Sequence, residues 1–294
     1  MSPNTTGALL MMLSMGAFVT NDTFLKLTDG AMPLFQLIFV RGLLATVLIY
    51  AIARYMGRLR LAISRRDKGL IALRGLAEIV TAYFFLTALF NMPLGNLNAI
   101  MQVVPLTVTL ASAIFLREAV GWRRMLAILI GLGGVMLIIR PGVDGFNIWS
   151  LYALGAVFGV TVRDMITRRL SADVSGMTVT LGTTVAVMAA AGLASLSQPY
   201  APLTAPLAGC IVASALFVSI GYFASIQAMR TGEVSFIAPF RYTGLVAAMI
   251  VGFFVFDEVP RGLTLLGAAI VMATGLFTFY RERMLQAREK TART

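Results

Sequence analysis

The chain has 294 residues, of which 59% are hydrophobic and only 13% are charged, whereas about 25% of the residues of an average soluble domain are charged. With a mean hydropathy of +0.86, this composition argues against a soluble globule. The net charge of +11 does not indicate nucleic-acid binding, because that function needs basic residues on a solvated face. Histidine is absent and Cys210 is the single cysteine, so the usual metal ligands and general bases are lacking. We therefore expect no metal, no cofactor and no enzymatic activity.

Apolar runs separated by turn residues predict ten helices, each long enough to cross the hydrocarbon core of a membrane. In chain order they cover residues 7–27, 33–55, 69–91, 96–116, 123–140, 147–167, 176–197, 207–229, 234–256 and 263–281. The links are short and contain helix breakers such as Pro33, Pro93 and Pro260. The sequence thus predicts an all-α polytopic membrane protein without a sizeable domain outside the lipid bilayer.

The distribution of Lys and Arg predicts the orientation of these helices, because cytoplasmic loops carry the excess of positive charge. Of the 24 basic residues, seventeen fall on the side that both termini share, and only Lys26, Arg140 and Arg261 fall on the other. The remaining four lie inside predicted spans: Arg41, Arg74, Arg163 and Arg241. Both termini are therefore expected in the cytoplasm.

A weak internal repeat runs through the chain. Residues 21–27 line up with 163–169 at an offset of 142, and residues 114–118 line up with 254–258 at an offset of 140. Five helices, an odd number, make up each unit, so the second unit must enter the membrane from the opposite side. This predicts two inverted repeats, residues 1–143 and 144–281, followed by a basic cytoplasmic tail, 282–294.

Several short motifs give the chain a family resemblance. They are Leu116-Arg117-Glu118, Leu126-Ala127, residues 131–135 and Arg140-Pro141-Gly142 in the first half, and residues 238–242 and Asp257-Glu258 in the second. They resemble the paired EamA modules of the drug/metabolite transporter superfamily, over about residues 7–281. The resemblance implies a ten-helix carrier of the bacterial inner membrane that exports small metabolites. Its similarity to aromatic amino-acid exporters implies amino acids as substrates, in particular aromatic residues, methionine and threonine.

Charged residues inside the spans are costly unless they are paired or functional. Arg41 and Arg241 lie about two turns inside, where either could bind a substrate carboxylate or instead satisfy backbone carbonyls at helix breaks. Arg74 and Glu78 are four residues apart on one helix face, which predicts an internal ion pair. Arg163 lies near a helix end and is expected to snorkel to the interface.

Three acidic residues, Asp22, Glu78 and Asp164, are candidate gates or proton sites. Asp22 and Asp164 occupy equivalent positions of the repeat, so one is expected near each mouth of the transport path. Capping of helix ends is the alternative role. An intramembrane enzyme that uses these carboxylates is a further alternative, but the predicted depths of the three residues scatter them.

Polar and aromatic side chains complete the predicted substrate site. An amide inside a span should line a cavity or bond to a neighbouring helix, and aromatic rings with a few hydroxyls can form an apolar pocket. The candidates are Tyr83, Asn98, Gln102, Tyr222, Phe240 and Tyr242. Packing in the core is the alternative for each of them.

Two prolines inside spans, Pro105 and Pro239, are candidate hinges, because proline removes an intrahelical hydrogen bond and favours a kink. Fixed kinks that shape the cavity are the alternative. The sequence as a whole predicts a secondary transporter, monomeric or weakly dimeric, that exports a small metabolite by alternating access. A passive channel and an exporter of another amphipathic metabolite or drug remain as alternatives.

Overall fold

The computed structural model describes residues 2–28, 30–57, 59, 63–117, 121–140, 147–171, 173–231 and 233–293, and the secondary structure of this part of the chain is entirely helical. The elements are α1 (Pro3–Lys26), α2 (Leu34–Tyr55), α3 (Arg65–Asn91), α4 (Leu94–Met101), α5 (Val104–Phe115), α6 (Trp122–Ile139), α7 (Trp149–Thr167), α8 (Gly176–Ser195), α9 (Ala205–Thr231), α10 (Val234–Ile237), the 3-10 helix η1 (Ala238–Tyr242), α11 (Thr243–Phe256) and α12 (Gly262–Arg293).

Nine helical spans within the described residues are long and apolar enough to cross a membrane, with α4 and α5 forming one span and η1 and α11 another. The tenth long helix, α7, has 19 residues and carries both Arg163 and Asp164. The prediction of an all-α polytopic membrane protein is therefore confirmed. The helix positions agree with the sequence to within a few residues, except that α12 continues to Arg293 through most of the predicted tail.

Local capping explains where several helices begin. The hydroxyl oxygens of Ser2, Ser64 and Ser175 accept hydrogen bonds from the backbone N–H groups three residues later, which satisfies donors that have no partner within the helix. Pro33 and Pro93 occupy the N-cap positions of α2 and α4. The start of each of these helices is thus fixed by local chemistry.

Two predicted spans, 96–116 and 234–256, are each interrupted rather than continuous. The first is divided into α4 and α5, with Gln102 and Val103 between them, and the second into α10, η1 and α11. Pro105 lies in the first turn of α5 and Pro239 in the first turn of η1, where a missing N–H does least harm to a helix. Both prolines therefore mark real breaks, while their role as hinges stays a prediction.

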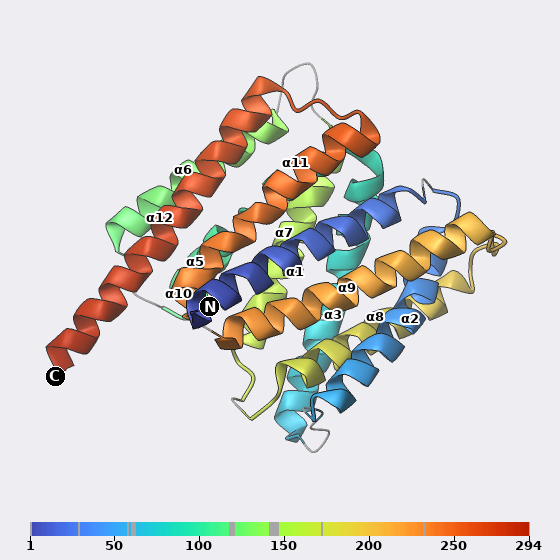
Figure 1. Cartoon of the computed structure of the whole chain (residues 1–294), viewed down its shortest axis with the longest axis horizontal. Helices are drawn as coiled ribbons and strands as arrows, with labels where there is room; N and C mark the ends of the chain where they lie inside the picture. The colour runs from blue at the N-terminus through green and yellow to red at the C-terminus, as the bar shows by residue number, and fades with distance from the viewer. Residues whose placement is uncertain are drawn as a thin grey trace.

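The helices form a bundle in which α1 and α9 lie side by side, with α2 and α8 to one side of this pair and α3 crossing behind it (Figure 1). On the other side of the pair lie α5, α6, α11 and α12, and both termini point toward the same end of the bundle (Figure 1). The other main helix pairs are α3 with α7, α2 with α8, and α6 with α12. The largest buried apolar cluster includes Leu89, Leu97 and Ile128.

Close approach of α6 and α12 depends on glycine. A Cβ atom at Gly134 would lie 2.9 Å from Ile270 Cγ2 and 3.0 Å from the backbone oxygen of Gly267. The neighbouring Gly133 has nothing within 4 Å of the same position. Small residues at helix crossings let backbones approach closely in membranes, so Gly134 and Gly133 should respond differently to the same substitution.

We expect Gly134→Ala to destabilise the protein by about 1 to 3 kcal/mol, because the added methyl group must displace backbone atoms of α12. Gly133→Ala is the matched control and should be neutral or slightly stabilising, since alanine favours a helix. The midpoint of thermal unfolding in detergent measures both effects. Equal midpoints for the two variants would contradict this account of the α6–α12 contact.

Candidate functional site

A polar layer within the bundle contains two clusters of charged side chains. In the first, Arg41 of α2 donates from Nη2 to Asn21 Oδ1 at 3.0 Å and from Nε to Ser214 Oγ at 3.0 Å. Ser214 Oγ donates to the same Asn21 oxygen at 2.8 Å, and Asn21 Nδ2 donates to Asp22 Oδ1 at 2.8 Å. Asn21, Asp22 and Ser214 are buried. This network thus joins α1, α2 and α9.

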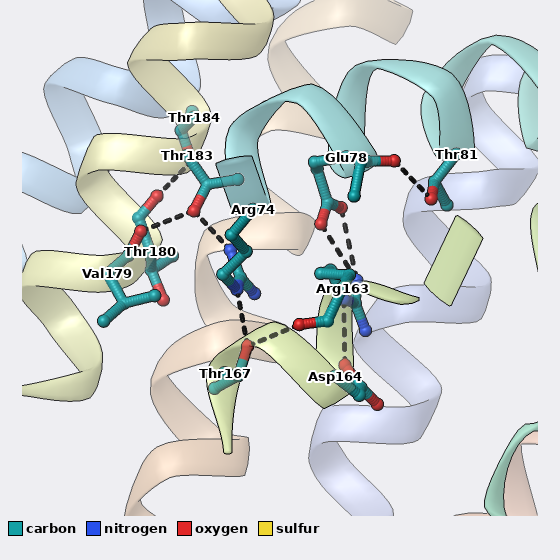
Figure 2. Close-up of polar contacts among 11 residues, drawn as sticks. Arg74, Glu78, Thr81, Arg163, Asp164, Thr167, Val179, Thr180, Thr183 and Thr184 are labelled. Carbon is teal, nitrogen blue, oxygen red and sulfur yellow. Dashed lines mark hydrogen bonds and ion pairs between the residues drawn. The ribbon is translucent and has the colours of Figure 1, made fainter. Parts of the chain in front are cut away.

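The second cluster is centred on Arg163 of α7 (Figure 2). Its Nη1 lies 3.1 Å from Glu78 Oε2 and 3.2 Å from Glu78 Oε1, and its Nε lies 3.0 Å from Asp164 Oδ1. The prediction that Arg163 snorkels is therefore wrong. Two carboxylates bind this guanidinium within the bundle, where its charge is neutralised at close range.

Arg74 does not pair with Glu78 as the sequence spacing suggested. Its Nε donates to Thr167 Oγ1 at 2.9 Å and its Nη1 donates to Thr183 Oγ1 (Figure 2). The prediction of an Arg74–Glu78 ion pair is wrong because Glu78 is engaged across the helix interface by Arg163. Glu78 thus pairs with Arg163 of another helix and not with Arg74 of its own helix. Sequence spacing along one helix cannot reveal such a partner.

A cavity of about 100 Å³ lies between α2, α3, α8 and α9 and adjoins both clusters. Its polar lining consists of Arg41, Arg74, Glu78, Thr180, Thr183, Thr184 and Tyr222. Arg74 and Thr180 also line a hollow of about 300 Å³ beside the α7–α8 link. The cavity therefore borders a second space that lies toward the end of α7.

The threonines of α8 give the cavity one wall of hydrogen-bond acceptors. Thr180, Thr183 and Thr184 donate their hydroxyl protons to the backbone oxygens four residues earlier, at 2.5 to 2.9 Å. Because these protons are used within the helix, the hydroxyl oxygens can act toward a ligand only as acceptors. Arg41 and Arg74 supply donors only. The cavity thus offers donors and acceptors to one small ligand.

Of the residues predicted for substrate contact, Arg41 and Tyr222 line this cavity, as does Glu78. Tyr222 is held by an edge-on contact with Phe18, whose ring centroid lies 5.3 Å away. Asp22 is linked to Arg41 by two hydrogen bonds through Asn21, which accepts from Arg41 and donates to Asp22. The sequence reasoning missed the threonines, although their spacing at positions i, i+3 and i+4 of one helix marks a polar face.

The other candidates lie outside the cavity lining. Tyr83 packs in an aromatic group with Phe84 and Tyr152, and Asn98 donates to the Leu94 oxygen of its own helix at 3.2 Å. Tyr242 is 4% exposed, with a buried hydroxyl that lacks a hydrogen-bond partner. Their contact with substrate stays a prediction.

The two helix breaks meet at Gln102 and Arg241. Gln102 Nε2 donates to the backbone oxygen of Arg241 at 3.4 Å, while the Arg241 side chain is exposed and Phe240 packs near Phe236. The Arg241 carbonyl, which also accepts from the backbone N–H of Thr243, thus receives a further donor from the other break. Arg241 lies apart from the cavity that contains Arg41.

We expect Glu78→Gln and Arg163→Gln each to lower the stability by about 1.5 to 3 kcal/mol, because each leaves a charged partner in the bundle with fewer counter-charges. The double variant should lose less than the sum, since both substitutions remove the same contact. Thermal unfolding in detergent measures the cycle, with the exposed Lys68→Gln of α3 as control. Strictly additive losses would show that the pair is not coupled.

Residues 5–140 match the EamA-like transporter family, and known proteins resemble nearly the whole chain. A protein of Vibrio cholerae named riboflavin transporter is 26% identical over 97% of this chain and 96% of its own length. The S-adenosylmethionine uptake transporter of Rickettsia bellii is 24% identical over 95% and 94%, and the pseudopaline exporter CntI of Pseudomonas aeruginosa is 26% identical over 90% and 93%.

One solved structure, described as "Crystal structure of protein", superimposes with a TM-score of 0.68 at 20% sequence identity, and covers 95% of this chain and 99% of its own. This likeness concerns the fold alone. The family match, the transporters that resemble nearly the full length, and the apolar spans agree with one another. The chain is a multi-pass bacterial inner-membrane transporter, and residues 5–140 of it match the EamA-like transporter family.

Proposed function

We propose that this transporter is a carrier for small amphipathic metabolites that combine a carboxylate with an ammonium or other donor group, with amino acids as the first class. The observation that supports this most directly is the cavity in which Arg41 and Arg74 provide donors while Glu78 and the threonines of α8 provide acceptors. An α-amino carboxylate carries both complementary groups on adjacent atoms. The aromatic ring of Tyr222 and apolar residues of α2 complete the wall.

The names of the relatives do not single out this substrate. They refer to riboflavin, S-adenosylmethionine and pseudopaline, with both uptake and export among them. Proteins that resemble this chain are therefore named for chemically different metabolites, and we expect the residues that line the cavity of each protein to determine its substrate. Aromatic amino acids, methionine and threonine remain the substrates to test first for this chain, and export from the cytoplasm remains the direction that we propose.

Alternating access would follow from two inverted five-helix repeats, residues 1–143 and 144–281. In these repeats α1, α2, α3 and α6 of the first half correspond to α7, α8, α9 and α12 of the second. Exchanging the corresponding helices turns the contact of α1 with α9 into the contact of α7 with α3, and it leaves the pairs α2–α8 and α6–α12 unchanged. The polar contacts follow the same exchange, because Arg41 donates to Ser214 and Arg74 donates to Thr183. Thr183 lies 142 residues after Arg41 and Ser214 lies 140 after Arg74, which are the offsets of the sequence repeat.

Some parts of this proposal fall on residues outside the described structure. They include Glu118, the Pro141-Gly142 motif and the boundary between the repeats at 143. The proposed cytoplasmic location of both termini is supported by the distribution of Lys and Arg. Asp22, Glu78 and Asp164 as gates or proton sites, and a monomer or weak homodimer as the oligomeric state, also stay predictions.

In liposomes, we expect saturable counterflow of labelled phenylalanine or methionine, whereas a channel would give flux that does not saturate. Arg41→Gln should lower the transport rate at least tenfold, because a charge-assisted contact to the carboxylate contributes about 1.5 to 3 kcal/mol. Arg54→Gln, on the exposed end of the same helix, is the matched control. Phenylalaninamide, which lacks the carboxylate, should compete at least tenfold more weakly than phenylalanine.

The results have distinct meanings. Lack of counterflow with every amino acid, with protein correctly inserted, would reject the substrate class. Equal competition by phenylalanine and phenylalaninamide would reject the role of the arginines in recognising the carboxylate. If Arg41→Gln reduced the folded yield as much as the transport rate, Arg41 would have a structural role only.

A further inference from the structure

A second group of charges lies outside the polar layer, where α1 ends. Lys26 Nζ is 2.6 Å from Glu258 Oε1, and the two side chains are only 14% and 17% exposed. Lys26 is the last residue of α1, while Glu258 belongs to the link between α11 and α12. The ion pair therefore joins the first half of the chain to the second half.

Backbone groups of a third segment hold the same two side chains. Lys26 Nζ donates to the oxygen of Met92 at 2.6 Å, and the N–H of Leu94 donates to Glu258 Oε2 at 2.7 Å. Leu94 is the first residue of α4, so the carboxylate lies at a helix N-terminus, where the helix dipole favours negative charge. Lys26 Nζ also lies 5.1 Å from the centroid of the Phe256 ring, a favourable cation–π position.

The local backbone presents Glu258 to these partners. Asp257 has a φ of 53° and ends α11 in the left-handed region, and the N–H of Glu258 donates to the oxygen of Gly252 at 2.9 Å. A Cβ atom at Gly252 would lie 3.0 Å from Glu258 Oε2, so glycine leaves the space that the carboxylate occupies. The contact is thus built by several elements together and is more than a chance surface pair.

The Lys26–Glu258 contact lies near one end of α7. The hollow of about 300 Å³ that adjoins the proposed substrate cavity lies near the other end. Glu258 borders a pocket of about 340 Å³ that includes Asn147 and Ser150, at the start of α7. The hollow that shares Arg74 and Thr180 with the cavity includes Thr167, the last residue of α7. With the proposed topology, the Lys26–Glu258 contact is at the outer end of the carrier.

We propose that Lys26 and Glu258 form an outer latch that must separate before the cavity opens to the outside. The inference rests on the proposed carrier function. Opening the outer end moves one half against the other, and Lys26 bonds to two segments that belong to different halves. An interaction present in one conformation and absent from the other shifts the equilibrium between them. Lys26 and Glu258 are therefore positioning residues that control access and do not contact the substrate.

The latch can be tested by labelling a cysteine in the cavity. Ala82 lines the cavity, so Ala82→Cys in a Cys210→Ser background gives one reporter thiol. A membrane-impermeant maleimide is applied to the outer side of intact cells. Glu258→Gln and Lys26→Met should each raise the labelling rate about tenfold, which corresponds to about 1.4 kcal/mol in the opening equilibrium. The double variant should label no faster than the faster single variant, because both changes break the same contact.

Two neighbouring substitutions serve as matched controls. Asp257→Asn removes the adjacent negative charge and keeps a residue that tolerates the left-handed conformation, and Arg261→Gln removes a positive charge from the same end of the protein. Both should label at the rate of the parent. The thermal midpoint of each variant is measured in parallel, and if Glu258→Gln proves unstable, Lys26→Met alone decides the result.

Unchanged outer labelling in the latch variants, or an equal rise in the two controls, would overturn the proposal. The labelling needs no substrate, so its failure is distinct from a failure of the proposed function. Absent amino-acid counterflow together with a tenfold rise in labelling would reject the amino-acid substrate and support the latch. Normal counterflow without a change in labelling would support the carrier function and reject the latch.

Discussion

The cost of placing charge and unpaired backbone groups in hydrocarbon constrains this structure more than any other factor. Arg163 is accommodated within the bundle because Glu78 and Asp164 bind its guanidinium from two sides. Arg41 is accommodated through the oxygens of Asn21 and Ser214. Each of these partners comes from a different helix or a neighbouring position, so the arginines hold α1, α2, α3, α7 and α9 in register. A polar layer of this kind stabilises the bundle only when its members are satisfied together.

The same constraint explains the helix breaks. A break within a membrane leaves carbonyl groups without intrahelical partners, and such groups must be bonded inside the protein. The α4–α5 break and the η1 segment meet where Gln102 donates to the Arg241 oxygen. The irregular backbone of these two breaks thus lies where the two halves of the chain contact each other.

The proposed transport cycle uses two separate regions of the protein. The cavity is assigned to substrate recognition, and the Lys26–Glu258 contact is assigned to the control of access. In the proposed function, recognition depends on the contrast between guanidinium donors and hydroxyl acceptors, of which α8 supplies three through its threonines. In the proposed latch, control of access depends on the ion pair that crosses between the halves at the end of α1. In these proposals recognition and closure use different residues, so either can change without the other.

Composition and apolar run length by themselves determined the helical membrane class and the approximate bounds of ten helices, since a bilayer requires long apolar segments whatever their neighbours. The positions of polar residues inside the predicted spans identified Arg41, Glu78 and Tyr222 as candidates, because polar groups at membrane depth are rarely without a role. Only the tertiary structure decided that Glu78 binds Arg163 rather than Arg74, that the threonines of α8 join Arg41 at one cavity, and that Tyr83 and Asn98 lie elsewhere. Spacing along one helix defines a face, but the partner of that face depends on how helices distant in sequence pack together.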